Sequence, residues 1–303
     1  MDKKRINKSI GRFFGWVALM SCYWALKLVP MRYTYAFARG VSSLAYLLAR
    51  KHRRVALDNL SLAFGQDKSK QELEGIAKQC FEFMAKGGME LLIFLGNPRR
   101  LKQNVKIINQ EHFDNALSRG KGVILVSAHF GNFPVLLARL SAEGYKIGAL
   151  MRVMRDKRVE KFFADRRKEL KMRTIYSQPR NVCVNDTIEA LRNNEAVFLP
   201  LDQNFGSGGV FVDFFGKKAA TAIGPVVFAR RTKAAIVPCF IIRQKDDTHQ
   251  IVFEPPLELE EGKDKQETIV INIQKLTNII ESYIRRYPAE WGWIHRRWKS
   301  KPS

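Results

Sequence analysis

The spacing of apolar positions changes about a third of the way along the chain. Over residues 1–100 apolar side chains recur at helical intervals, most regularly within residues 69–95. Beyond residue 100, short continuous apolar runs alternate with helical patterns. The runs GVILVS at 122–127 and AVFLPL at 196–201 are typical of strands that are buried on both faces of a parallel sheet. This alternation predicts an α/β fold with a mixed, mostly parallel sheet flanked by helices.

The other predicted elements continue the alternation. Further strands are predicted at residues 105–108, 147–152, 236–243 and 250–254. Helices are predicted at residues 134–143, 157–171, 182–193, 221–232 and 265–286. Because crossovers between parallel strands are right-handed, we expect the loops that follow the strands to lie along one edge of the sheet.

Two apolar segments near the N-terminus predict contact with a membrane. The first, residues 13–29, carries Trp16, Tyr23 and Trp24, and aromatic rings of these types settle at the bilayer–water boundary. Its length is marginal against the roughly 20 apolar residues that a spanning helix needs. A single span, an interfacial helix and a helix packed on the domain all remain open. No small-residue cleavage site follows, because the segment runs directly into Pro30.

Basic residues flank both apolar segments. The N-terminal cations are Lys3, Lys4, Arg5, Lys8 and Arg12. The second segment, residues 35–49, ends in the run RKHRR at 50–54, which suits anionic headgroups or a solvated helix end equally well. We expect residues 1–50 to form a membrane-associated helical N-terminus and residues 51–303 to form the α/β domain. The basic flank favours a cytoplasmic N-terminus.

The charge balance indicates an anionic partner. The 52 Lys and Arg residues exceed the 29 Asp and Glu residues, which gives a formal net charge of +23. Nucleic acid, anionic lipid and acidic carrier proteins are all candidates. The sequence carries no zinc knuckle, RNA-recognition motif or helix-turn-helix signature, and its cations are spread along the chain, so no nucleic-acid partner is expected. The four cysteines form no C-x-x-C pair, which predicts reduced thiols and no metal site.

Polar clusters follow the two strongest strand candidates. Residues 127–132, SAHFGN, follow the first, and residues 202–204, DQN, follow the second. Ligands of open α/β sheets bind at the carboxyl ends of strands, so neighbouring strands would bring His129 and Asp202 into one crevice. Histidine has a pKa suited to removing a proton from an alcohol, although a structural histidine is the alternative. Asn132 is a good helix N-cap, and the N–H groups near Gly131 and Asn132 are candidate oxyanion donors.

Other candidates are less specific. Arg152 ends a predicted strand, where it suits bidentate binding of phosphate or carboxylate, or a surface salt bridge. The tail WGWIHRRWK at 291–299 alternates aromatic and cationic residues, which fits an interface, a phosphate site or a capped core. His52 lies in the cationic run, and His112 and His249 are expected in polar loops.

Taken together, these motifs resemble the late acyltransferases of lipid A biosynthesis, the lauroyl and myristoyl transferases of the lysophospholipid acyltransferase superfamily. The matching segments, in chain order, are RRVALDNLSLAFG at 53–65, SAHFGNF at 127–133, LDQNFGSGGVFVDFFGKKAAT at 201–221 and WGWIHRRWK at 291–299. The resemblance implies a glycerol-3-phosphate acyltransferase-like fold and an enzyme on the cytoplasmic face of the bacterial inner membrane. It implies transfer of an acyl chain from acyl carrier protein, or acyl-CoA, to a hydroxyl of a lipid A precursor or a related glycolipid or lysolipid, without a cofactor.

The chain departs from the family at one catalytic position. His129 matches the family's histidine, but Pro134 stands where the motif has Asp or Glu. Such a carboxylate fixes the imidazole tautomer. We expect Asp202 to replace it, with Glu90 as the weaker choice. The alternatives are an unassisted, slow His129 and a catalytically impaired homologue that only binds lipid.

The resemblance also implies substrate-binding positions. Arg152 matches the family's arginine and would contact the acceptor phosphate. The other positions expected to contact substrate are Gly131, Gln203, Gly209, Phe211 and Arg296. Phe211, Phe214 and Phe215 would line an acyl channel, or would fill the core as such aromatic residues usually do.

Overall fold

The computed structural model describes residues 3–302, except for the side chains of residues 3–8 and Ser207. The basic side chains of Lys3, Lys4, Arg5 and Lys8 therefore lie outside the described part of the chain. Five helices open the chain: α1 (Lys3–Leu28), α2 (Met31–Leu48), α3 (Arg50–Phe64), α4 (Lys70–Phe94) and α5 (Pro98–Asn104). The later helices are α6 (Gln110–Leu117), α7 (Phe133–Ala142), α8 (Lys157–Glu169), α9 (Arg180–Arg192), α10 (Gly224–Thr232), α11 (Lys265–Arg286) and the short 3-10 turns η1 (Gly206–Gly208) and η2 (Pro288–Glu290).

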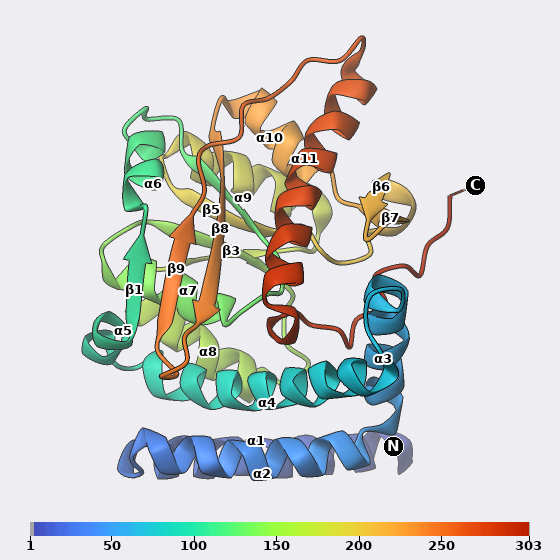
Figure 1. The fold of residues 1–303 in the computed structure, drawn as a ribbon. Helices are drawn as coiled ribbons and strands as arrows, with labels where there is room; N and C mark the ends of the chain where they lie inside the picture. The colour runs from blue at the N-terminus through green and yellow to red at the C-terminus, as the bar shows by residue number, and fades with distance from the viewer. Residues whose placement is uncertain (1–2, 303) are drawn as a thin grey trace.

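The strands form one large sheet and a separate hairpin. They are β1 (Val105–Ile108), β2 (Val123–Ser127), β3 (Ile147–Met151), β4 (Arg173–Tyr176), β5 (Ala196–Pro200), β6 (Val210–Phe214), β7 (Lys217–Thr221), β8 (Ala235–Arg243) and β9 (His249–Phe253). The seven-stranded sheet has the order β1-β9-β8-β2-β5-β3-β4, and β6 and β7 pair antiparallel outside it. Only the β8–β9 pairing within the sheet is antiparallel. The predicted mixed, mostly parallel α/β fold is confirmed, with helices packed around the sheet (Figure 1).

The central strands β2 and β5 are composed almost entirely of apolar residues, which explains their position in the middle of the sheet. All five residues of β2 are buried, as are the first four of β5, so neither face of these strands is exposed to solvent. The two strands are neighbours in parallel register, with Ser127 opposite Pro200. The ladder continues one step further, where the Leu201 N–H donates to the Ser127 carbonyl at 2.9 Å. The loops after β2 and β5 therefore leave the sheet side by side.

Several elements differ from the prediction. The helix expected at 221–232 begins only at Gly224, because residues 217–221 pair with β6 across a turn whose Phe215 and Gly216 have positive φ. Strand β4 was not predicted; it is short and lies at the sheet edge, where its burial is incomplete. The expectation of polar loops around His112 and His249 was wrong. His112 lies on α6, and His249 is a fully buried residue at the start of β9.

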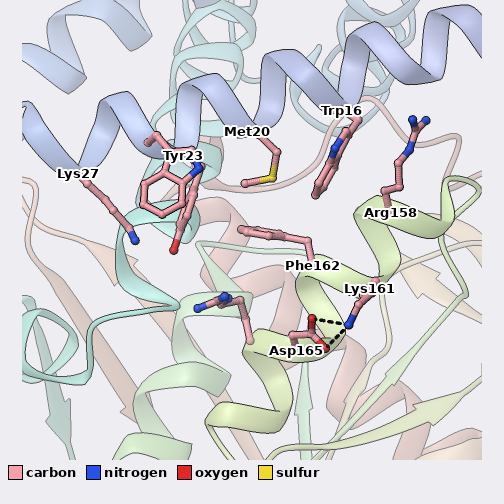
Figure 2. A pocket seen from close by; sticks show the side chains of 10 residues that line it. Trp16, Met20, Tyr23, Lys27, Arg158, Lys161, Phe162 and Asp165 are labelled. Carbon is pink, nitrogen blue, oxygen red and sulfur yellow. Dashed lines mark hydrogen bonds and ion pairs between the residues drawn. The ribbon is translucent and has the colours of Figure 1, made fainter.

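The N-terminal helices pack on the α/β domain. Within residues 3–302, no helix combines the length and the apolar character that crossing a bilayer demands. Both α1 and α2 contact α4, and they lie below it, away from the sheet, in Figure 1. Trp16 and Tyr23 of α1 face Phe162 of α8 with edge-on ring contacts of 6.2 and 5.1 Å, beside a cavity of about 410 Å³ (Figure 2). The structure therefore shows α1 packed on the domain through one face, which leaves its other face exposed.

Candidate active site

A histidine–aspartate pair lies at the carboxyl edge of the sheet. His129 follows β2 and Asp202 follows β5, and the His129 Nδ1 atom is 2.9 Å from Asp202 Oδ1. The Asp202 side chain is only 3% exposed, whereas 34% of the His129 side chain is accessible. The register of the two neighbouring strands thus places a buried carboxylate directly behind an imidazole that solvent can reach.

The contacts of this pair select one tautomer of His129. Asp202 accepts from Nδ1, so the neutral ring carries its proton there and leaves the lone pair on Nε2. The amide nitrogen of the exposed Gln203 lies 3.2 Å from Nε2 and can donate to it. Trp291 holds the other carboxylate oxygen, because its Nε1–H donates to Asp202 Oδ2 at 2.8 Å. The accessible nitrogen is therefore an acceptor, as a general base requires.

The two members of the pair shift each other's pKa. Burial lowers the pKa of His129, but the charge and the hydrogen bond of Asp202 outweigh it, so the net pKa lies above the ordinary value. Burial raises the pKa of Asp202, but the charge of His129 and the hydrogen bonds from His129 and Trp291 bring it below the ordinary value. Asp202 is consequently ionised at neutral pH, and it stabilises the charged form of His129 that proton transfer creates.

The C-terminal segment clamps the turn that carries His129. The Gly131 N–H donates to the Glu290 carbonyl at 2.8 Å, and the Gly292 N–H donates to the His129 carbonyl at 3.2 Å. Gly131 has a φ of +59°, and a Cβ built there would lie 2.0 Å from the carbonyl oxygen of Ile241. Only glycine fits this position without moving the backbone.

The structure corrects two expectations about this turn in part. The Gly131 N–H cannot serve as an oxyanion donor, because Glu290 already occupies it. Asn132 occupies the N-cap position of α7, but its side chain makes no capping bond there. Its Nδ2 instead donates to the Gly87 carbonyl and to Glu90 Oε2, each at 3.0 Å. Within residues 3–302, the backbone N–H groups of Asn132 and Phe133 have no acceptor, so they are the remaining donors of this turn.

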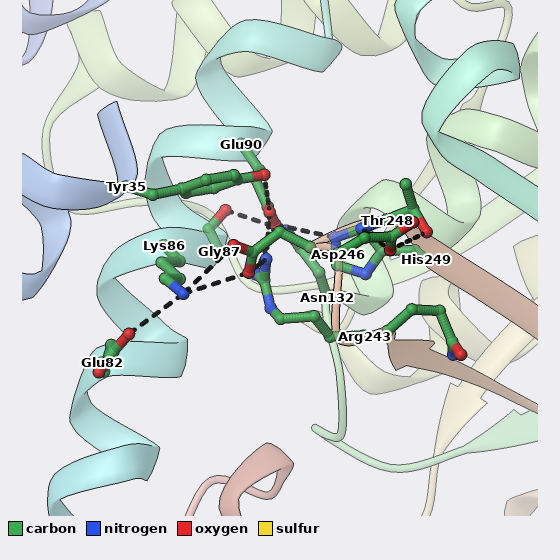
Figure 3. Close-up of polar contacts among 12 residues, drawn as sticks. Tyr35, Glu82, Lys86, Gly87, Glu90, Asn132, Arg243, Asp246, Thr248 and His249 are labelled. Atoms are coloured by element: carbon green, nitrogen blue, oxygen red, sulfur yellow. Dashed lines mark hydrogen bonds and ion pairs between the residues drawn. The ribbon is translucent and has the colours of Figure 1, made fainter. Parts of the chain in front are cut away.

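Glu90 does not approach His129; it forms the centre of a separate buried network (Figure 3). The carboxylate is fully buried and accepts from Tyr35 on α2 at 2.8 Å and from both Arg243 nitrogens at the end of β8. His249 Nε2 lies 3.1 Å from its Oε2. Burial raises the pKa of Glu90, but the hydrogen bonds and charges of His249 and Arg243 lower it to about 2. Glu90, the second carboxylate considered as a partner of His129, therefore has a structural role. Its hydrogen bonds connect α2, α4 and the sheet to the turn that follows His129.

Replacing Glu90 with alanine is expected to destabilise the fold by about 3 kcal/mol, because the buried Arg243 charge loses its fully buried partner and keeps only the more exposed Asp247. Urea unfolding followed by circular dichroism would measure the change. Glu82→Ala on the same helix is the control, since Glu82 pairs with Lys86 near the surface and such pairs contribute about 1 kcal/mol or less. Equal losses in the two variants would contradict the assignment.

The other predicted substrate contacts lie at different places. Arg152 directly follows β3, is exposed, and forms no ion pair within the described residues. It shares the carboxyl edge with His129 but lies two strands away in the order β2-β5-β3, roughly 10 Å by the usual strand spacing. Gly209 packs its Cα against β7, where a Cβ would meet the Thr221 carbonyl at 2.3 Å. Half-buried Phe211 stands opposite Ala220 in the hairpin.

The aromatic residues of the hairpin fill the core. Phe214 stacks on Trp298 at 5.5 Å and meets Trp291 edge-on at 5.6 Å. Phe215 is 5% exposed and contacts Phe64 of α3 at 5.2 Å. Of the two alternatives for these two rings, core packing is observed.

Two neighbouring arginines of the tail have opposite environments. Arg296, the predicted contact, is exposed, whereas Arg297 is fully buried. Arg297 donates to the carbonyls of Gln203 and Ala220 and to the Thr221 hydroxyl. Burial lowers its pKa to about 10 even though Asp202 raises it. Sequence reasoning missed Arg297 and the bond from Trp291 to Asp202; the alternation of aromatic and cationic residues in the tail was the only signal.

Comparisons with known proteins place the whole chain in one family. The profile described as "Bacterial lipid A biosynthesis acyltransferase" matches residues 2–300. The lipid A biosynthesis lauroyltransferase of Escherichia coli (strain K12) is 26% identical over 295 residues, which cover 92% of this chain and 90% of that protein. The palmitoleoyltransferase of the same organism is 24% identical, over 86% and 83% of the two chains. A phosphatidylinositol mannoside acyltransferase of Mycolicibacterium smegmatis is 24% identical, over 66% and 64%.

Proposed function

The chain belongs to the bacterial lipid A biosynthesis acyltransferase family and is a lipid acyltransferase, and we propose that it acylates a hydroxyl of a lipid A precursor or a related glycolipid or lysolipid. The acyl donor in this proposal is a thioester of acyl carrier protein, with acyl-CoA as the other thioester of the same chemistry. The observation that carries the proposal is the partly exposed imidazole of His129, backed by the buried carboxylate of Asp202, with the exposed Gln203 amide on Nε2 as the contact that a substrate hydroxyl would replace.

The proposed reaction uses this geometry. The hydroxyl oxygen attacks the thioester carbonyl while His129 Nε2 takes its proton, and Asp202 stabilises the imidazolium that forms. The new C–O bond creates a tetrahedral oxyanion. When that intermediate collapses, the C–S bond breaks, the electron pair leaves with sulfur, and His129 returns its proton to the thiolate. Every atom and charge is accounted for without a metal or an organic cofactor.

Two further roles complete the proposed site. The unoccupied N–H groups of Asn132 and Phe133 at the start of α7 would stabilise the oxyanion, because hydrogen-bond donors aimed at developing charge act strongly in a desolvated site. Arg152 would hold an anionic group of the acceptor from its place at the same sheet edge, since no carboxylate of the described chain neutralises it. Its roughly 10 Å offset from His129 suits a headgroup rather than the reacting atoms.

The alternative is a homologue that binds lipid without catalysis, and Pro134 is the observation that favours it. Pro134 lies in the first turn of α7, where it can neither orient nor charge-stabilise the imidazole. The contact between Asp202 and His129 supports the active enzyme instead, because a carboxylate from a second strand makes the bond that the missing motif residue would make.

The outer faces of α1 and α2 support binding to a membrane surface. Among the described side chains, thirteen of the eighteen large apolar residues that are exposed lie within residues 10–48. These helices face away from the sheet (Figure 1), and α3 continues from α2 with a basic run. We infer that residues 1–50 lie on the cytoplasmic face of the bacterial inner membrane, with apolar side chains among the lipids and cations at anionic headgroups.

Replacing Phe14 and Phe37 with serine is expected to weaken binding to phosphatidylglycerol vesicles by about tenfold or more, because each exposed ring loses its apolar contact. Flotation on a density gradient would measure the bound fraction. The double variant Ile108→Ser/Val182→Ser is the control, since these exposed apolar residues lie on the α/β domain. If both variants floated like the parent chain, the proposed membrane face would be wrong.

The proposed reaction is tested by incubating the purified chain with acyl carrier protein thioesters and a lipid A precursor, or with a lysophospholipid. Mass spectrometry should show a product heavier by one acyl chain and a free carrier thiol in equal amount. If neither acceptor gained an acyl chain from carrier protein or from CoA, the proposed substrates would have to be abandoned.

A further inference from the structure

A basic pocket of about 440 Å³ lies where α3 meets the C-terminal segment. It is lined by Lys51, His52 and Val55 of α3, by Asn204 from the loop after β5, and by Ile294, His295, Arg296 and Lys299 of the tail. Its volume lies within the range of about 300–1,000 Å³ that is usual for small-molecule sites. The pocket thus has the size of a ligand site and is built from segments that are far apart in the sequence.

No carboxylate lines this pocket. Lys51, Arg296 and Lys299 form no ion pair within residues 3–302, although many other cations of the chain do. Three like charges around one concavity repel each other, so the pocket concentrates a positive potential that an anion would relieve. Its charge therefore selects an anionic ligand.

The pocket is connected to the catalytic pair by consecutive residues. The Asn204 N–H donates to His295 Nε2 at 3.2 Å, and its neighbour Gln203 contacts His129. Burial lowers the pKa of His295, which suits a neutral ring that accepts this bond. A ligand in the pocket would therefore lie beside the loop that carries Asp202 and Gln203.

The tail that forms one wall is held firmly in position. Asn59, a buried residue of α3, donates through Nδ2 to the carbonyls of Trp293 and His295, both at 2.7 Å. These bonds fix the backbone on either side of Ile294, directly at the pocket wall. The cations of the tail and of α3 are thereby presented together before any ligand arrives, which lowers the ordering cost of binding.

We propose that this pocket binds a phosphate group carried by one of the two substrates. The group is either a phosphate of the acceptor headgroup or the phosphate of the donor's phosphopantetheine arm. Phosphate fits better than a single carboxylate, because it carries up to two charges and several acceptor oxygens for one arginine fork and two ammonium groups. The proposal rests on the acyl transfer proposed above, and it identifies where that reaction holds a substrate's anionic group.

The test compares two triple variants with the same loss of charge. The pocket variant is Lys51→Ala/Arg296→Ala/Lys299→Ala. The control variant is Lys121→Ala/Lys146→Ala/Arg192→Ala, which removes exposed cations near the opposite, amino-terminal edge of the sheet. Both variants lose three positive charges, so a general electrostatic effect would affect them equally.

Binding of inorganic pyrophosphate, measured by calorimetry at fixed ionic strength, tests the pocket without any acyl transfer. The parent chain and the control variant should bind it with equal affinity, and the pocket variant should bind at least about tenfold more weakly. Equal affinity in all three proteins would overturn the proposed pocket. This measurement remains decisive even if the parent chain transferred no acyl group, so the two proposals can fail separately.

Steady-state kinetics then identifies the source of the phosphate. If the acceptor supplies it, the pocket variant should raise the acceptor KM about tenfold or more, with kcat retained, and the effect should vanish with a dephosphorylated acceptor. If the donor supplies it, the donor KM should rise whichever acceptor is used. KM values equal to those of the control variant for both substrates would refute a role for the pocket in substrate binding.

Discussion

Replacement of His129 by alanine is expected to reduce kcat for acyl transfer by about 10³- to 10⁴-fold, the upper part of the range for loss of a general base. The alanine variant has no group that can take the hydroxyl proton, since Asp202 is buried behind the ring and does not reach solvent. Mass-spectrometric product formation over single time courses would measure the rate. Substrate affinity should change little, because the imidazole acts in the transition state rather than in binding.

The matched control for this variant is His112→Ala. His112 is a partly exposed histidine of α6 whose side chain makes no hydrogen bond within the described residues, so its removal changes composition without touching the site. The control should retain the parental rate. An alanine variant of His129 that worked as fast as the control would leave the enzyme without its proposed base, and another group would have to be found.

Replacement of Asp202 by asparagine is expected to lower kcat by about 10²- to 10⁴-fold, the upper bound being the loss found for the equivalent change in a serine protease. The asparagine keeps the shape of the side chain, and its oxygen can still accept from Trp291. Its amide nitrogen would then donate to His129 Nδ1, which moves the ring proton to Nε2 and removes the lone pair that should accept the substrate proton. Asp58→Asn, an exposed position on α3, is the control.

The same variant should change the pH dependence in a defined direction. Asp202 raises the pKa of His129 above its ordinary value, so the parental kcat/KM should rise with pH as His129 loses its proton through that raised pKa. Without the carboxylate the imidazolium loses its stabilisation, and the acid limb of the profile should move to lower pH. A merely structural role for Asp202 would lower the rate without moving this limb. Parental rates in the Asp202 variant would instead support the alternative of an unassisted His129.

The fold could largely be predicted because its central strands carry a local signal. Strands β2 and β5 are continuous apolar runs, and a strand that is buried on both faces has no other composition available. The hairpin β6–β7 carried no such signal. Its second strand, KKAAT, has small and charged residues without alternation, and only its pairing with β6 makes it a strand. The edge strand β4 was not predicted from the sequence for a related reason. It is only partly buried, and it is a strand because it pairs with β3.

The site was predictable only where it depends on strand ends. His129 and Asp202 each follow a recognisable strand, so their shared edge could be inferred, although their catalytic roles remain predictions. The oxyanion assignment to Gly131 failed because a carbonyl from Glu290, about 160 positions later, occupies its N–H. A sequence pattern around Gly131 cannot indicate a hydrogen-bond acceptor that lies so far along the chain.

The fold class, the family and the pair of loops in which the proposed chemistry lies could be inferred from the amino-acid sequence, because apolar periodicity and short motifs are local properties of the chain. The folded chain was needed to show that Asp202 contacts the imidazole and that Glu90 instead lies in a buried network. It was also needed to show that the C-terminal segment supplies Trp291 and one wall of the basic pocket. These contacts join segments that are distant in the chain. The energies of these contacts depend on burial and on precise geometry, and both arise only when the chain folds.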